Sequence, residues 1–309
     1  MTALLLRRYN ALSPLTRGMF LGLLAMVLFG LTLPMTRVAI GDEAAPQLSP
    51  LFVTFSRAVL AAGMSIGLLV LTRSPWPKPE QWRPLAMAAL GNVIGYPLLL
   101  AIALRSVTAS HAAVVTALLP LATAAIAAWT FRQRPGMAFW SCALAGAALV
   151  VAYSLLRSNQ DGHGFRLEWA DILLVASVLA ASLGYVQGAR ITPELGAERV
   201  ICWVTVISLP VTLPGTLLFW PAAQASASAW LALIYLGLFS MWIGFFAWYR
   251  GLAIGGAVKV SQVQLLQPFF AILFAVPLLG EGLDALTVGC AAAVVVTVYI
   301  GKRVSGGAQ

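Results

Sequence analysis

The fold is decided by residues 91–136, which read GNVIGYPLLLAIALRSVTASHAAVVTALLPLATAAIAAWTFRQRPG, because the chain uses their pattern twice. A second version, IGFFAWYRGLAIGGAVKVSQVQLLQPFFAILFAVPLLGEGLD, occupies residues 243–284. At a shift of 148 positions Pro120 falls on Pro268, and Cys142 falls on Cys290. Each copy reads as an apolar helix, a small-residue turn, a helix with a mid-span proline, a polar break and another apolar helix. The pattern therefore predicts an internally duplicated chain.

The composition around this stretch indicates a protein whose solvent is lipid. Hydrophobic residues make up 61% of the chain and charged residues only 9%, whereas soluble domains carry roughly 25% charged residues. The net charge of +9 does not indicate a nucleic-acid partner, because the basic residues are scattered singly or in small groups between apolar runs. The three cysteines lie inside apolar runs, so we interpret them as packing residues without disulfides or a bound metal.

Apolar runs of about 20 residues, the length that crosses a bilayer, fill almost the whole chain. A cleaved signal peptide is the alternative for the first run, but this run is long and no small-residue cleavage site closes it. We therefore interpret it as a retained span. The ten expected spans are 18–38, 50–72, 84–105, 109–131, 137–157, 169–190, 199–219, 228–250, 257–279 and 283–301.

The distribution of lysine and arginine predicts the orientation of these spans. With the N-terminus inside, 14 of the 19 basic residues fall in inside segments, four fall outside and Arg57 falls within a span. Both termini are therefore expected to be cytoplasmic. Five spans in each half reverse the second half relative to the first. The predicted fold is all-α and polytopic, with ten transmembrane helices as two inverted five-helix repeats, residues 1–157 and 169–303, around a central cavity; this architecture is typical of secondary transporters.

Charged and titratable residues are rare inside the expected spans. All ten acidic residues fall in loops or at span ends, so we expect no buried carboxylate to act as a proton relay. No catalytic motif or histidine–carboxylate pair with metal spacing is present, so we expect no enzyme activity, no cofactor and no metal. His111 is expected to face the headgroups, with a gating role as the alternative. Arg57 either meets a substrate carboxylate, or it reaches outward to the headgroups or bonds carbonyls at a helix break.

Neutral polar and aromatic residues at mid-span are the better candidates for a binding site. An amide that faced lipid would carry a large desolvation cost, so these groups face a cavity or another helix. The alternative roles are hydrogen bonding between helices for the amides and an interfacial belt for the aromatic residues. Without a cluster of opposite charge, such a cavity suits a neutral or zwitterionic small molecule such as an amino acid. The candidate substrate-binding residues are Thr32, Asn92, Tyr96, Tyr185, Gln187, Trp242, Phe246, Tyr249, Gln264 and Gln267.

Several motifs resemble the EamA family of the drug/metabolite transporter superfamily. They are the FGLTLP segment at Phe29–Pro34, the arginine at Arg57, the proline of the fourth span followed by a polar break, and QPFFAILFAVPLLGEGLD at Gln267–Asp284. The Gly-Glu element of the family is present as Gly280-Glu281, but the equivalent position of the first half reads Phe131-Arg132-Gln133 and lacks the acidic residue.

Within that family the chain is most similar to the YddG-type exporters of aromatic and other amino acids in bacterial inner membranes. The resemblance implies ten helices around a central cavity, alternating access and export of amino acids, with another small metabolite or drug as the alternative substrate. We further expect a monomer in contact with membrane lipid.

Overall fold

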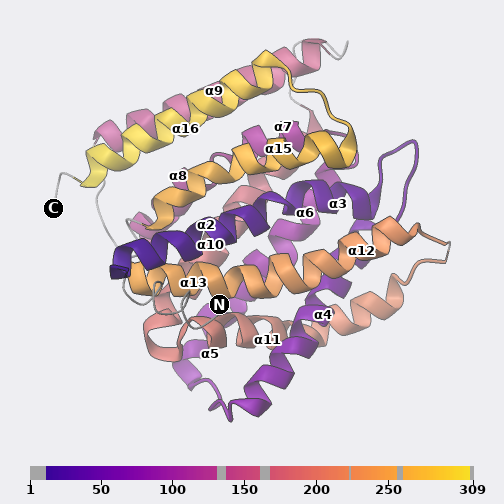
Figure 1. Cartoon of the computed structure of the whole chain (residues 1–309), viewed down its shortest axis with the longest axis vertical. Helices are drawn as coiled ribbons and strands as arrows, with labels where there is room; N and C mark the ends of the chain where they lie inside the picture. The colour runs from indigo at the N-terminus through magenta and orange to yellow at the C-terminus, as the bar shows by residue number, and fades with distance from the viewer. Residues whose placement is uncertain (1–11, 131–136, 161–167, 223, 256–259, 307–309) are drawn as a thin grey trace.

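The computed structural model describes residues 12–130, 137–160, 168–222, 224–255 and 260–306, and these residues are almost entirely helical (Figure 1). Strands are absent from this part of the chain apart from one isolated bridge between Gly41 and Pro46. The helices of the first half are α2 (Pro14–Gly30), α3 (Thr32–Ile40), α4 (Pro50–Leu71), α5 (Pro79–Ala89), η1 (Leu90–Gly95), α6 (Tyr96–Ala103), α7 (Ala109–Thr116), α8 (Leu119–Thr130) and α9 (Met137–Gln160). Those of the second half are α10 (Trp169–Leu195), α11 (Ala197–Leu218), α12 (Ala227–Tyr235), η2 (Leu236–Ile243), α13 (Gly244–Gly255), η3 (Ser261–Leu266), α15 (Gln267–Leu279) and α16 (Ala285–Gly306).

Seven helical stretches in the described part of the chain are long and apolar enough to cross a membrane. Shorter apolar helices lie within three further stretches, at Trp140–Tyr153, Val263–Leu279 and Ala285–Thr297. The protein is therefore a polytopic all-helical membrane protein.

Serine and threonine caps fix where several of the helices begin. The Ser49 hydroxyl accepts a hydrogen bond from the Phe52 amide at the start of α4, and Thr108 accepts one from the His111 amide at the start of α7. Ser226 caps α12 in the same way. A proline follows Ser49 directly, where its missing amide hydrogen costs nothing.

Five of the long helical stretches are interrupted, and a proline explains four of these interruptions. A proline has no N–H for the carbonyl four residues earlier. Pro34 frees the carbonyl of Gly30, where α2 ends, and Pro120 frees that of Thr116, where α7 ends. Pro97 of α6 frees a carbonyl in the preceding π-helix η1, and Pro268 of α15 frees one in the preceding 3₁₀-helix η3. Pro210, in contrast, lies inside α11 without ending it.

The element boundaries repeat along the chain. Helices α5, α6, α8 and α9 begin at residues 79, 96, 119 and 137, and helices α12, α13, α15 and α16 begin at residues 227, 244, 267 and 285. Each pair of starts differs by 148 positions, which is the shift found in the sequence. Both halves also contain a π-helix at the corresponding place, η1 and η2.

Packing joins the two halves rather than separating them. Helix α4 packs along α11, and α2 packs along α13. Helices α9 and α16 pair with each other along one edge of the bundle (Figure 1). The described buried apolar side chains form two large clusters, one around α3, α6 and α7 and the other around α2, α11 and α13.

Candidate functional site

A hollow of about 330 Å³ lies where the helix interruptions meet. Both halves of the chain contribute to it, and neither Asp nor Glu is among its described lining residues. The lining residues are Phe29, Thr32, Arg57, Asn92, Tyr96, Tyr185, Ser240, Met241, Phe245 and Gln267.

Arg57 supplies the positive charge of this hollow. Its side chain comes from the middle of α4 and the residue is only 3% exposed. The Nη2 atom donates to the Ser240 hydroxyl at 3.1 Å, and Ser240 in turn shares a 2.8 Å hydrogen bond with the Thr32 hydroxyl. The Nε atom has no hydrogen-bond partner among the described residues. Arg57 therefore faces the protein interior, and the alternative of a side chain that reaches the headgroups is wrong.

Asn92 projects from η1 into the same hollow. Its side chain is buried, and neither the amide nitrogen nor the amide oxygen has a partner among the described residues. The side chain lies against Gly184 of α10, where an added Cβ would be 2.8 Å from the Asn92 amide nitrogen. The glycine thus makes room for the amide. A buried amide without partners carries a desolvation cost that a polar ligand would remove.

Aromatic rings form another part of the wall. The rings of Phe29 and Phe245 lie 5.2 Å apart, and those of Tyr185 and Phe245 lie 6.0 Å apart. Tyr96, four residues after Asn92, also lines the hollow. These rings give the cavity an apolar surface beside the guanidinium and the amide.

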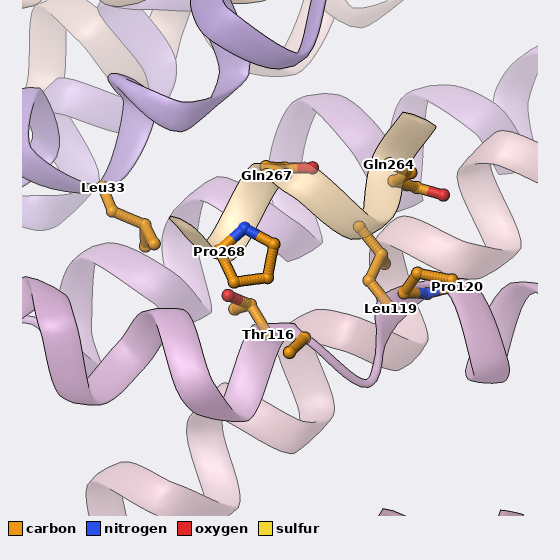
Figure 2. A pocket seen from close by; sticks show the side chains of 8 residues that line it. Leu33, Thr116, Leu119, Pro120, Gln264, Gln267 and Pro268 are labelled. Carbon is orange, nitrogen blue, oxygen red and sulfur yellow. The ribbon is translucent and has the colours of Figure 1, made fainter. Parts of the chain in front are cut away.

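A second hollow, of about 240 Å³, lies between the α7–α8 interruption and the η3–α15 interruption (Figure 2). Gln267 lines both hollows, so the two adjoin at this residue. Thr116 and Gln264 supply the other polar groups. The remaining lining residues are Leu33, Ala117, Leu119, Pro120 and Pro268.

Seven of the residues expected from sequence thus line the two hollows: Thr32, Arg57, Asn92, Tyr96, Tyr185, Gln264 and Gln267. The other four candidate substrate-binding residues line neither hollow. Gln187 is buried in α10, and Tyr249 is buried with its ring edge against Gly188. The ring centroids of Trp242 and Phe246 lie 4.7 Å apart. Trp242 lies near the end of the π-helix η2, and Tyr249 lies in the α-helix α13 that follows.

Ser240 is a lining residue that the sequence interpretation missed. It lies 148 positions after Asn92, so the internal repeat contained the signal that would have identified it. The same shift relates Thr116 to Gln264. Two pairs of polar residues of the site therefore occupy equivalent places in the two halves.

His111 requires a correction. We expected it to face the headgroups, but its Nε2 atom lies 2.7 Å from the Asp171 carboxylate and both side chains are 7% exposed. Asp171 lies near the start of α10, at the end of an expected span, but its side chain is buried. The pair joins α7 of the first half to α10 of the second, outside both hollows. His163, the other histidine, lies outside the described residues.

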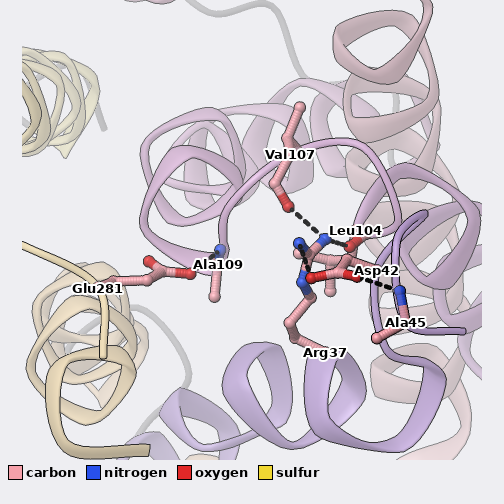
Figure 3. Close-up of polar contacts among 7 residues, drawn as sticks. All are labelled: Arg37, Asp42, Ala45, Leu104, Val107, Ala109 and Glu281. Atoms are coloured by element: carbon pink, nitrogen blue, oxygen red, sulfur yellow. Dashed lines mark hydrogen bonds and ion pairs between the residues drawn. The ribbon is translucent and has the colours of Figure 1, made fainter. Parts of the chain in front are cut away.

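Further contacts between the halves surround this pair. The His111 ring lies 5.2 Å from the Tyr153 ring of α9, and the Tyr153 hydroxyl bonds to Thr287 of α16 at 3.2 Å. The Glu281 carboxylate accepts hydrogen bonds from the Ala109 amide at 2.7 Å and the Ser110 amide at 2.9 Å, and so caps α7 (Figure 3).

Arg37 stabilises the turn that precedes α7. Its guanidinium donates to the carbonyl oxygens of Leu104 and Val107, and its Nη2 atom is 3.7 Å from the Asp42 carboxylate (Figure 3). The Asp42 carboxylate also accepts a hydrogen bond from the Ala45 amide at 2.7 Å. Neither the Arg37 contacts nor the Glu281 cap was expected from the sequence, because each joins segments far apart in the chain.

Comparison with known proteins identifies the class to which this fold and site belong. The model of the EamA-like transporter family matches residues 16–156 and 168–301. The chain belongs to the EamA-like transporter family, and it is a transporter rather than an enzyme.

Individual relatives agree with this assignment. An uncharacterised transporter of Bacillus subtilis, YdeK, is 40% identical over 290 residues, which cover 93% of this chain and 98% of that protein. The aromatic amino acid exporter YddG of Ancylobacter novellus is 28% identical over 280 residues, covering 88% of this chain and 92% of that protein. A crystal structure of 20% sequence identity shares the fold with a TM-score of 0.64, over 95% of this chain and 99% of that one.

Proposed function

We propose that this protein exports amino acids, aromatic and other neutral ones, across the bacterial plasma membrane by alternating access. The observation that carries the proposal is the buried guanidinium of Arg57 in a hollow that has no carboxylate among its described lining residues. An uncompensated buried cation favours an anionic group, and the α-carboxylate that every amino acid carries is such a group.

The other lining residues suit the rest of an amino acid. The Asn92 amide oxygen, which lacks a partner among the described residues, can accept a hydrogen bond from the α-ammonium group. Tyr96, Tyr185 and Phe245 offer aromatic faces to an ammonium group or to an apolar side chain. The name of the Ancylobacter novellus relative supports the same substrate class and the outward direction.

The proposed transport cycle uses ten helices in two inverted repeats, residues 1–157 and 169–303, with both termini in the cytoplasm and the protein as a monomer. The repeated helix starts and the two matches to the family model support this division. Side chains from both halves line the site, so movement of one repeat against the other would expose it to each side of the membrane in turn. The substrate site itself is proposed to work without a carboxylate proton relay.

Transport by the purified protein in proteoliposomes tests this function. We expect protein-dependent efflux of labelled phenylalanine and threonine whose rate is the same with and without a pH gradient. Phenethylamine, which lacks the carboxylate, should compete poorly with phenylalanine. Folded protein that moves neither amino acid would contradict the proposal and favour another small metabolite or drug.

Arg57 provides the matching test of the site. Arg57→Gln should lower kcat/KM for phenylalanine by roughly 10- to 100-fold, because a charge-assisted hydrogen bond to the carboxylate is lost. Arg83→Gln removes an exposed arginine at the start of the third span and should leave transport unchanged. Equal transport by Arg57→Gln and the wild type would remove Arg57 from the site.

A further inference from the structure

The hollow of Figure 2 has the chemistry of a pocket for a side chain rather than for a charged group. Leu33, Ala117, Leu119 and two prolines give it an apolar wall, and no charged residue is among its described lining residues. Gln267 connects it to the Arg57 hollow. An amino acid whose carboxylate lies at Arg57 would therefore have this second hollow beside it, on the side of Gln267.

Two polar groups in this apolar wall have unused hydrogen-bonding capacity. Gln264 is 4% exposed, and its side-chain amide forms no hydrogen bond with another described residue. The Thr116 hydroxyl donates to the Ala113 carbonyl at 3.2 Å, which leaves its oxygen lone pairs available to a ligand. A buried amide with no partner is unfavourable unless a ligand supplies one.

We propose that this hollow is the side-chain subsite of the transporter, and that it selects amino acids whose side chain ends in a hydroxyl or amide group. This inference rests on the proposed function and adds to it the residues that set specificity. Thr116 and Gln264 are those residues. Tyrosine is expected to be preferred over phenylalanine.

The chemistry of a hydroxyl explains this selection. A hydroxyl group is both a donor and an acceptor, so it can donate to the Thr116 oxygen or, at the other end of the hollow, accept from the Gln264 amide nitrogen. A substrate without the hydroxyl would displace water from these groups and leave them unpaired. Sites built to hydrogen-bond a substrate hydroxyl discriminate more strongly than sites that only measure apolar size.

Two substitutions of similar shape test the inference in proteoliposomes. Thr116→Val and Gln264→Met remove the polar groups while keeping most of the side-chain volume. In the wild type we expect kcat/KM for tyrosine to exceed that for phenylalanine by roughly 10-fold. In either variant this ratio should fall towards one, with phenylalanine still transported. Thr212→Val, which removes a buried hydroxyl of α11 that lines neither hollow, should keep the wild-type ratio.

The outcomes separate this inference from the proposed function. Transport of tyrosine and phenylalanine by the wild type at equal kcat/KM, or a ratio unchanged in both variants, would overturn the subsite while leaving amino acid export intact. Absence of any amino acid transport by folded wild-type protein would overturn the proposed function, and the subsite with it. Thermal unfolding in detergent identifies a variant that has failed to fold. If both of these variants fail, Thr116→Ser, which keeps the hydroxyl, should retain the wild-type ratio, and a ratio near one in this variant would contradict the inference.

Discussion

Gly91 allows η1 and α10 to pack closely because it has no side chain. An added Cβ at this residue of η1 would contact the Ala180 carbonyl oxygen of α10 and lie 2.8 Å from the Gly184 amide nitrogen. Both contacts are with backbone, which cannot rotate away. We expect Gly91→Ala to lower the free energy of unfolding by about 1–3 kcal/mol. Gly67→Ala is the control, because an added Cβ at this residue of α4 would meet nothing within 4 Å. Equal thermal unfolding of both variants would contradict this packing.

The buried pair of His111 and Asp171 makes a second prediction at the scale of a residue. His111→Ala removes a 2.7 Å hydrogen bond to a buried carboxylate and leaves a void beside the Tyr153 ring. The expected loss is about 3 kcal/mol in the free energy of unfolding. Ser110→Ala, at the neighbouring residue of α7, should cost much less, because the buried Ser110 hydroxyl has no partner among the described residues. Thermal unfolding in detergent compares the two variants. Similar melting temperatures would show that the hydrogen bond between His111 and Asp171 does not stabilise the protein.

At the scale of an element, the start of α7 depends on a residue 172 positions further along the chain. Glu281 accepts hydrogen bonds from two amides in the first turn of α7, where the helix dipole also favours a negative charge. Glu281→Gln keeps an acceptor but loses the charge, so it should cost about 0.5–1 kcal/mol. Glu281→Ala removes both acceptors and should cost about 2 kcal/mol.

Hydrogen exchange measures this cap directly. The amides of Ala109 and Ser110 should exchange faster in Glu281→Ala than in the wild type. Glu43→Gln changes an exposed loop carboxylate and serves as the control. If the two amides exchange at the wild-type rate without Glu281, the carboxylate does not cap α7.

The sequence predicted the elements better than the contacts between them. Apolar length located the spans, and proline marked four of the interruptions because its missing N–H has a local effect. The interruption at η2 contains no proline, so no local sequence signal marked it. The partners of His111 and Glu281 depend on how distant helices pack, and spacing along one helix carries no information about that.

At the scale of the whole molecule, the duplication is the feature that connects fold and site. The shift of 148 positions found in the sequence relates the helix starts, the two π-helices and the polar pairs Asn92 with Ser240 and Thr116 with Gln264. The repeat thus places one polar group from each half beside the same cavity. Arg57 breaks the symmetry, because its equivalent in the second half is Thr205, which is buried in α11 and bonds to Ser65. A site with one cation has a defined orientation for a substrate that carries one carboxylate.

The inverted arrangement of the repeats makes a prediction that two equivalent residues can test. Glu80 in α5 and Ser228 in α12 are both exposed, both lie near the start of a helix and differ by 148 positions. If the second repeat enters the membrane from the opposite side, these positions face opposite sides, and the lysine and arginine distribution places Glu80 in the cytoplasm. In a variant whose three native cysteines are replaced by alanine, Ser228→Cys should react with a membrane-impermeant maleimide in intact cells. Glu80→Cys should react only after the membrane is permeabilised. Two repeats of the same orientation would place both cysteines on one side of the membrane. Equal labelling of the two variants in intact cells would therefore exclude the inverted repeat, and with it alternating access by two inverted halves that exchange conformations.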